Sequence, residues 1–232
     1  MEEITITQNG FNGEYMSYLL AKVRDRFSFL PSTSDMRSDG EHVEVAFRTE
    51  RAYCPYVRKF TEEHIADVIA IGYKYAYFEK QLALPLLKAE DRRLLLTALV
   101  AADYPEDKAY ALRKLRGQRS YCLDGVYNFR LRELARRWEG IADYVPTDMG
   151  EEALDGFLGY LTEDGEGKIF LKDGKVYDDK YRVLTKSVLT GKETTFGEII
   201  LGGAEKVYCF GETDEKTARL LKKYYGEKAV FC

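Results

Sequence analysis

The chain has 232 residues, of which 45% are hydrophobic and 32% are charged, and its formal net charge is −4. A chain of this length buries enough surface to fold around an ordinary hydrophobic core without disulfides or a structural metal. No stretch approaches the ~20 apolar residues that cross a bilayer, which excludes a membrane-spanning protein and predicts no membrane partner. So small a net charge does not predict a polyanionic or polycationic partner for the molecule as a whole.

The first ten residues, MEEITITQNG, carry acidic side chains where a secretory signal has a basic end followed by an apolar run. We therefore expect a cytoplasmic protein. The cysteines fit this compartment, because they are scattered through a chain too long to need a disulfide framework. We expect reduced thiols at Cys54, Cys122, Cys209 and Cys232.

Residues 1–56 are predicted to form a small β-α-β part. Apolar and polar residues alternate from Ile4 to Thr7 and again from Val43 to Arg48, as in strands with one buried face. Between these stretches, apolar residues recur at spacings of three and four from Met16 to Phe27, and Pro31 follows as a stop signal. The pattern indicates one helix between two strands.

Residues 57–166 are predicted to form a helical region. One helix is expected from Thr61 on, because Glu62 and Glu63 favour a helix N-terminus. Others are expected over residues 94–100 and 105–116. The clearest periodicity is an apolar stripe that predicts one continuous helix packed against others. The stripe consists of Tyr127, Leu131, Leu134, Trp138, Ile141 and Val145.

Residues 167–232 are predicted to form a C-terminal part that begins with a hairpin, because Asp173 and Gly174 give a turn signal between two short apolar runs. Strands expected over residues 207–210 and 229–231 are joined by a helix and should lie parallel. The predicted fold class is α+β, with a helical central region flanked by the β-α-β part and by this part with its hairpin and parallel strands joined by helices. No linker separates the three parts, so the alternative that they form one compact domain is kept.

Cys209 and Cys232 each lie near the end of a predicted strand. If Lys206 pairs with Ala229, the two thiols lie side by side, at an interstrand spacing of ~4.8 Å that a disulfide can bridge. The alternative, which we favour, is that both are small buried hydrophobic residues in a reducing cytosol.

The sequence holds no group of residues that names a reaction. A nucleophilic triad needs a base, and the only histidines, His42 and His64, are expected on solvated surfaces. His64 and Asp67 lie one helical turn apart, but zinc sites take three or four protein ligands, so we predict no metal. The glycine-containing stretches lack the spacing of nucleotide loops, so we predict no cofactor and assign no catalytic residue.

A strongly basic segment departs from the mildly acidic average of the chain. Between residues 113 and 137, only Asp124 and Glu133 oppose its cations. Arginine side chains suit phosphate or carboxylate groups, so such a face can bind nucleic acid or an acidic partner, or can pair with acidic residues of neighbouring helices. Arg132 belongs to the segment, and the candidate binding residues are Arg113, Lys114, Arg116, Arg119, Arg130, Arg136 and Arg137.

Three stretches of the chain carry a family resemblance. The run VRKFTEEHIADVIAIGYKYAYFEKQL from Val57 has an Ile-Ala-Asp-Val-Ile core, and LDGVYNFRLRELARRWEGIADYV from Leu123 has the motif Asp-Gly-Val-x-x-Phe-Arg-Leu. The third stretch is a short apolar helix, a strand from Lys206, a helix and a last strand ending in Cys232. Together they resemble the YtxC-like sporulation protein family of endospore-forming bacteria. The resemblance implies a role linked to sporulation and a cytoplasmic location, and it supplies no activity, cofactor or catalytic residue.

Three hypotheses about function follow from these observations. The leading one is a structural or interaction protein of a sporulating bacterium, with an unknown protein partner. The alternative is a nucleic-acid-binding module that uses residues 113–137 and whose binding weakens steeply as salt rises. A second alternative is an enzyme with a carboxylate and arginine site, in which Arg130 clamps an anion.

Overall fold

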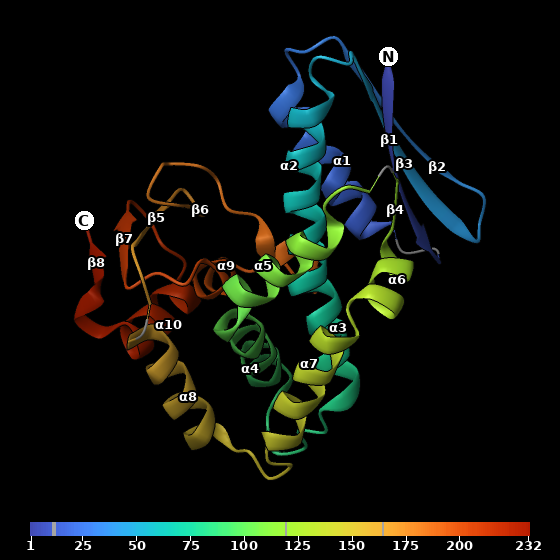
Figure 1. The fold of residues 1–232 in the computed structure, drawn as a ribbon. Helices are drawn as coiled ribbons and strands as arrows, with labels where there is room; N and C mark the ends of the chain where they lie inside the picture. The colour runs from blue at the N-terminus through green and yellow to red at the C-terminus, as the bar shows by residue number, and fades with distance from the viewer. Residues whose placement is uncertain (11–12, 119, 164) are drawn as a thin grey trace. The chain divides into compact units, whose positions relative to one another are not determined.

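The chain folds as two units in a computed structural model that describes residues 1–10, 13–118, 120–163 and 165–232 (Figure 1). Unit 1 joins Met1–Lys74 to Pro105–Glu139, and unit 2 joins Tyr75–Tyr104 to Gly140–Cys232. In the described parts of the chain each unit contains helices and a small mixed sheet, which confirms the α+β class. The predicted three parts follow chain order, with borders at residues 56 and 166, whereas each unit takes in two separate stretches of chain.

Unit 1 is built on a mixed sheet with the strand order β2-β3-β1-β4. Its strands are β1 (Glu2–Asn9), β2 (Ser32–Ser38), β3 (His42–Thr49) and β4 (Ser120–Cys122). β1 is antiparallel to β3 and parallel to β4. The sequence predicts neither β2 nor β4, because β2 is a polar run without apolar alternation and β4 has only three residues. Both are edge strands, which are held by pairing on one side and need no continuous apolar face.

Helices cover one face of this sheet, where α1 packs against β2 and β3, and α2 packs against β1 (Figure 1). The helical elements are α1 (Glu14–Phe27), α2 (Cys54–Asp67), the π-helix η1 (Val68–Tyr73), α5 (Tyr104–Leu115), α6 (Leu123–Gly125), the π-helix η2 (Val126–Arg130) and α7 (Arg132–Tyr144). The borders between the units fall inside α3 (Lys74–Gln81), α5 and α7. α2 begins at Cys54 instead of the expected Thr61, because Pro55 is well suited to a first helical turn.

The apolar stripe that starts at Tyr127 does not form one continuous helix. The backbone widens into η2, and Leu131 then leaves the helical region, with φ −110° and ψ 25°. α7 starts after this break and buries Leu134 and Trp138 completely. The stripe fills an interior at these two positions as predicted. The predicted continuous helix is therefore wrong, and the break places Arg130 in η2 and Arg137 in α7.

Unit 2 contains a second mixed sheet, with the strand order β6-β5-β7-β8. Its strands are β5 (Lys168–Lys172), β6 (Lys175–Tyr177), β7 (Lys206–Phe210) and β8 (Ala229–Phe231). The predicted hairpin is present between β5 and β6, where Asp173 and Gly174 have φ values of 50° and 72°. Two successive positive φ values are what a two-residue hairpin turn of type I′ requires. β7 is parallel to both β5 and β8, which confirms the predicted parallel crossover.

The register of β7 and β8 separates the two cysteines. Val207 pairs with Ala229, so Cys209 lies opposite Phe231 and not opposite Cys232. The side-by-side register, which we did not favour, is off by one residue, because the 3₁₀ turn η4 (Gly226–Lys228) comes directly before β8. The favoured alternative, two buried cysteines, is confirmed for Cys209 and wrong for Cys232. Both thiols are free, Cys209 is buried and Cys232 is exposed. Burial raises the pKa of the Cys209 thiol.

Helix α4 forms the centre of unit 2, because every residue from Leu95 to Val100 is buried and the helix packs against α8 and α9. The helical elements of unit 2 are α3 (Lys74–Gln81) from its second residue on, α4 (Ala89–Ala102), α8 (Glu151–Glu163), the 3₁₀ helix η3 (Lys186–Thr190), α9 (Thr195–Gly202) and α10 (Glu215–Tyr224). Neither α4 nor any other helix in the described ranges is long and apolar enough to cross a membrane.

Candidate anion-binding surface

The structure places four of the predicted basic residues on two helices of unit 1. Arg113 and Lys114 lie in the last turn of α5, and Arg136 and Arg137 lie on α7. All four are exposed, as is Arg116, which follows the end of α5. The remaining two candidates are not brought into this group: Arg130 ends η2, and Arg119 lies outside the described residues.

The ring of Tyr110 lies among three of these cations, Arg113, Lys114 and Arg137. The guanidinium carbons of Arg113 and Arg137 are 5.5 and 5.4 Å from the ring centroid, and Lys114 Nζ is 5.2 Å from it. Each distance is within the ~6 Å over which a cation is attracted to an aromatic face. Tyr110, Arg113, Lys114, Glu133 and Arg137 together are called the Tyr110 cluster below.

Glu133 is the acidic member of the cluster. The Tyr110 hydroxyl donates a hydrogen bond to Glu133 Oε2 at 2.6 Å. This bond, with the positive charge of Lys114, holds the pKa of Glu133 below its usual value. Burial and the bond to Glu133 raise the pKa of Tyr110. Glu133 is therefore charged and Tyr110 is protonated at neutral pH, so one carboxylate faces three cations at this surface.

A buried carboxylate beneath the cluster anchors it to the interior of unit 1. Asp107 is 1% exposed and accepts a hydrogen bond from Trp138 Nε1 at 2.8 Å. It also pairs with Lys74 Nζ at 2.9 Å and with Arg137 Nη2 at 3.1 Å. Lys74 is completely buried. Arg137 also reaches the surface, where its side chain is 46% exposed.

A second buried carboxylate fixes α5 against α2. Asp67 Oδ1 pairs with Lys108 Nζ at 2.6 Å, and Asp67 Oδ2 lies 3.1 Å from His64 Nδ1. His64 Nδ1 is also 3.2 Å from the Tyr18 hydroxyl. The expected solvated position of His64 is wrong, because its side chain is only 17% exposed. Asp67 and His64 are thus members of a hydrogen-bond network that holds Lys108, next to Asp107 on α5, in place.

Comparisons of the chain with models of known protein families, with curated proteins and with solved structures gave no match. The resemblance to the YtxC-like sporulation protein family stays a prediction.

The sequence reasoning missed Tyr110 and Asp107, the two residues that organise the cluster. A signal was available, because Asp107, Tyr110 and Lys114 recur at spacings of three and four and so share one face of α5. The indole N–H of a buried tryptophan also requires an acceptor, and Trp138 is predicted to be buried. What the sequence does not indicate is that Asp107 is this acceptor.

Unit 2 contains a separate charged hollow of about 270 Å³, formed by α4, α9 and α10. The N-caps of two helices contribute to it: Thr194 accepts a hydrogen bond from Gly197 N, and Asp214 accepts one from Thr217 N. The hollow carries both signs of charge, from Glu90, Asp91, Arg93, Lys192, Asp214, Lys216 and Arg219. The charges of this hollow oppose one another, and the N-cap side chains Thr194 and Asp214 already accept hydrogen bonds from N–H groups of α9 and α10. The hollow therefore favours an anion less than the Tyr110 cluster does.

Arg130 is exposed and lines neither this hollow nor the cavity of unit 1 described below, as far as the described residues define them. The alternative of an enzyme in which Arg130 clamps an anion beside carboxylates stays a prediction.

Proposed function

We propose that this chain is a binding protein, without catalytic activity, that holds an acidic segment of a protein partner on the Tyr110 cluster. The observation that carries the proposal is the packing of Arg113, Lys114 and Arg137 around one tyrosine ring, opposed at the surface by Glu133. A group of cations held this closely favours an anionic partner, which would relieve the repulsion among them.

The arginines of the cluster suit carboxylates in particular. A guanidinium presents paired N–H donors that match the two oxygens of a carboxylate. Arg137 is held by Asp107 and by the Tyr110 ring before any partner arrives. A side chain that is already fixed loses less rotamer freedom on binding, so more of the interaction energy appears as affinity.

A protein partner agrees better with the cluster than nucleic acid does. Proteins that bind duplex DNA tightly contact ~6–10 phosphates, whereas this cluster offers three cations around a central carboxylate. Glu133 repels the closely spaced phosphates of a duplex, and the net charge of the chain, −4, adds to the repulsion. An acidic peptide can place its side chains on either side of Glu133.

The cellular setting is part of the same proposal. The resemblance to the YtxC-like family supports a role linked to sporulation and a cytoplasmic location, so sporulating cells are where the partner is to be sought.

Binding of a fluorescein-labelled decapeptide of glutamate, followed by fluorescence polarisation at two salt concentrations, tests the proposal. The variant Arg113→Gln with Lys114→Gln removes two cations of the cluster and leaves the buried network intact. We expect it to weaken peptide binding at least about tenfold, since hydrogen bonds to charged groups are lost. The matched control, Arg51→Gln with Lys59→Gln, removes the same charge from exposed positions of unit 1 and should leave the affinity within about twofold.

Two results would contradict the proposal. One is equal loss of affinity in both double variants, which would mean that only net charge matters. The other is tighter and more salt-sensitive binding of a DNA or RNA duplex than of the peptide, which would favour the nucleic-acid alternative. A pull-down from sporulating cells with the wild-type chain and both double variants extends the test, because a true partner is lost with Arg113→Gln and Lys114→Gln alone.

A further inference from the structure

Edge strand β2 leaves a space between the sheet of unit 1 and the end of α1. In the strand register Ser32 lies opposite Thr49, and Ser34 lies opposite Phe47. These serines therefore share the face of the sheet that carries the buried Phe47, the face that α1 covers. A serine side chain is too small to fill the space between the sheet and the helix packed on it. The result is a cavity of about 380 Å³.

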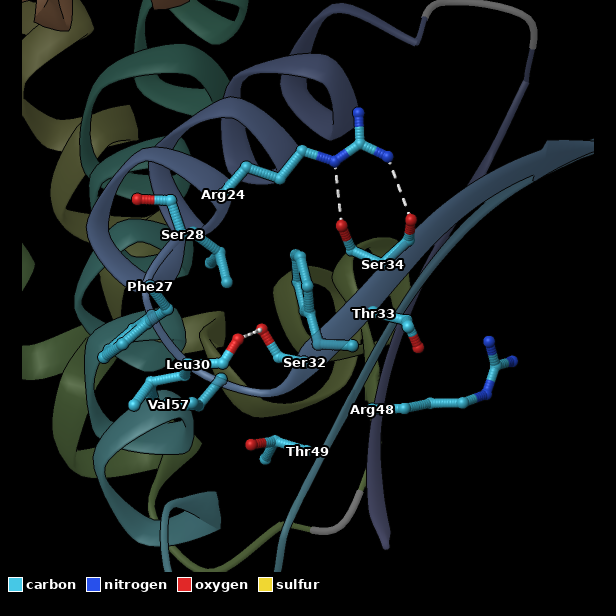
Figure 2. Close-up of a pocket in the computed structure, with 12 residues that line it drawn as sticks. Arg24, Phe27, Ser28, Leu30, Ser32, Thr33, Ser34, Arg48, Thr49 and Val57 are labelled. Carbon is cyan, nitrogen blue, oxygen red and sulfur yellow. Dashed lines mark hydrogen bonds between the residues drawn. The ribbon is translucent and has the colours of Figure 1, made fainter.

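The walls of this cavity are mostly apolar below a polar rim (Figure 2). Phe27 and Leu30 come from the end of α1 and the turn after it, and Val57 comes from α2 (Figure 2). Val23 and Phe47 are buried and complete the apolar lining. A volume of this size and a lining of this kind are typical of small-molecule sites, which occupy ~300–1,000 Å³.

One buried hydroxyl in the wall has no partner within the described chain. Thr49 is 0% exposed, and its Oγ1 makes no hydrogen bond to any described residue. In Figure 2 this hydroxyl points toward the side of the cavity formed by Leu30 and Val57. Buried polar groups are rarely left without a hydrogen bond, so the position of Thr49 indicates that something else bonds to it.

Arg24 places a cation at the rim. Arg24 Nε donates to Ser34 Oγ at 2.8 Å, and one of its terminal nitrogens donates to the Ser34 carbonyl at 2.9 Å (Figure 2). These two bonds hold the guanidinium beside the cavity. No described carboxylate pairs with it, so its charge is not neutralised by this part of the chain. Arg48, the other arginine of the lining, points away and pairs with Glu3 and Asp35.

We propose that this cavity binds a small carboxylic acid whose apolar body carries one hydrogen-bonding atom. The carboxylate bonds to Arg24 at the rim. The apolar body fills the space between Phe27, Phe47 and Val57, and its polar atom bonds to the Thr49 hydroxyl. The site is independent of the Tyr110 cluster, because none of these residues belongs to it.

Three probes that differ by one group each test this assignment. They are 3-(4-hydroxyphenyl)propionate, 3-phenylpropionate, which lacks the hydroxyl, and 3-(4-hydroxyphenyl)propanamide, which lacks the charge. Affinities are measured by calorimetry on the full chain, and the site is located from the amide NMR shifts that each probe causes. We expect the hydroxylated acid to bind most tightly, with saturable shifts confined to residues of the cavity wall.

Three variants assign the contacts, each with its own expected result. Thr49→Val removes the hydroxyl at nearly constant volume and should weaken the hydroxylated acid about threefold to tenfold, with 3-phenylpropionate unchanged. Arg24→Gln should weaken both acids at least about tenfold and leave the amide unchanged. Ser32→Leu fills the space and should abolish binding of all three probes. Thr5→Val and Arg26→Gln are matched controls elsewhere in the same unit, and neither should change any affinity.

The assignment is overturned if none of the three probes binds saturably, or if the shifts lie outside the cavity wall. It is also overturned if Thr49→Val weakens the two acids equally, because the hydroxyl then plays no part in recognition. Should Ser32→Leu fail to fold, the Thr49→Val and Arg24→Gln results decide the question, since the first replacement keeps the side-chain volume nearly constant and the second changes an exposed residue.

Discussion

Asp107 in unit 1 and Glu198 in unit 2 are both buried carboxylates, but different groups hold them. Asp107 is bonded by three side chains, two of which are cations. Glu198 is bonded by backbone N–H groups, with Lys186 N at 2.7 Å and Ser187 N at 2.6 Å. Backbone amides carry no net charge and are fixed by the chain. Side-chain cations bring charge with them and can extend to the surface.

The difference shows what each carboxylate does for its unit. Glu198 fastens η3 to α9 through these two backbone hydrogen bonds. Asp107 determines where Arg137 lies, and Arg137 is part of an exposed group of cations. A carboxylate held by cations can therefore support a binding surface, whereas one held by amides supports local structure.

The largest expected effect comes from Asp107→Asn, which leaves the completely buried Lys74 without this carboxylate. Removing one partner of a buried ion pair costs about 3–5 kcal/mol of unfolding free energy. Urea unfolding followed by circular dichroism measures the loss. Adding Lys74→Met should restore part of it, because the buried charge is then gone. A loss below about 1 kcal/mol would show that the pair behaves like one at the surface.

A smaller loss is expected for Glu198→Gln, about 1–3 kcal/mol. The amide group of glutamine keeps one acceptor for the two N–H donors, and no buried cation is left behind. The same urea experiment measures it, and a loss equal to or above that of Asp107→Asn would remove the distinction between the two carboxylates.

Asp214 is a third carboxylate that accepts a hydrogen bond from a backbone N–H, but unlike Glu198 it is exposed. Asp214→Ala removes the N-cap of α10 and should cost about 1 kcal/mol at neutral pH. Hydrogen bonds from the Thr217 hydroxyl and backbone N–H hold the pKa of Asp214 below its ordinary value of 3.8. The contribution is therefore complete above that value and is lost as the pH falls through the lower folded-state pKa. Unfolding free energies at pH 7 and below pH 3.8 should show the wild-type advantage shrinking, and an advantage that does not depend on pH would contradict the assignment.

The smallest effect on stability is expected for Arg113→Gln with Lys114→Gln, the variant that should weaken partner binding most. These cations repel each other and are exposed, so the melting temperature should not fall measurably, and removal of repulsion can raise it slightly at low salt. A clear fall in melting temperature would mean that the Tyr110 cluster serves the fold and not a partner.

Local patterns account for the parts of this fold that the sequence predicts. The hairpin at Asp173 and Gly174 follows from two residues that tolerate positive φ. The buried face with Leu134 and Trp138 follows from helical spacing. Strands β2 and β4 are not predicted, because apolar and polar residues do not alternate in them and only their pairing with β3 and β1 holds them in the sheet.

The candidate site is predictable only in its composition. The sequence reveals that residues 113–137 are rich in arginine, but not that Tyr110 gathers three of the cations or that Asp107 and Lys74 lie beneath them. Those contacts join α5, α7 and the start of α3. These three segments are far apart in the sequence, and no sequence pattern indicates that they meet. The same holds for His64. The local pattern predicts an exposed side chain, whereas contacts with Asp67 and Tyr18 hold it in a partly buried position.

During synthesis the ribosome delivers β1 long before its parallel partner β4, and residues 75–104 of unit 2 emerge between them. Unit 1 can close its sheet once residue 122 has left the exit tunnel, whereas α4 must wait for α8 and α9 to cover Leu95–Val100. The nascent chain therefore carries an uncovered apolar helix from the time α4 is complete at Ala102 until α9 is complete at Gly202. Such a chain gains from chaperone contact until its last third has been made.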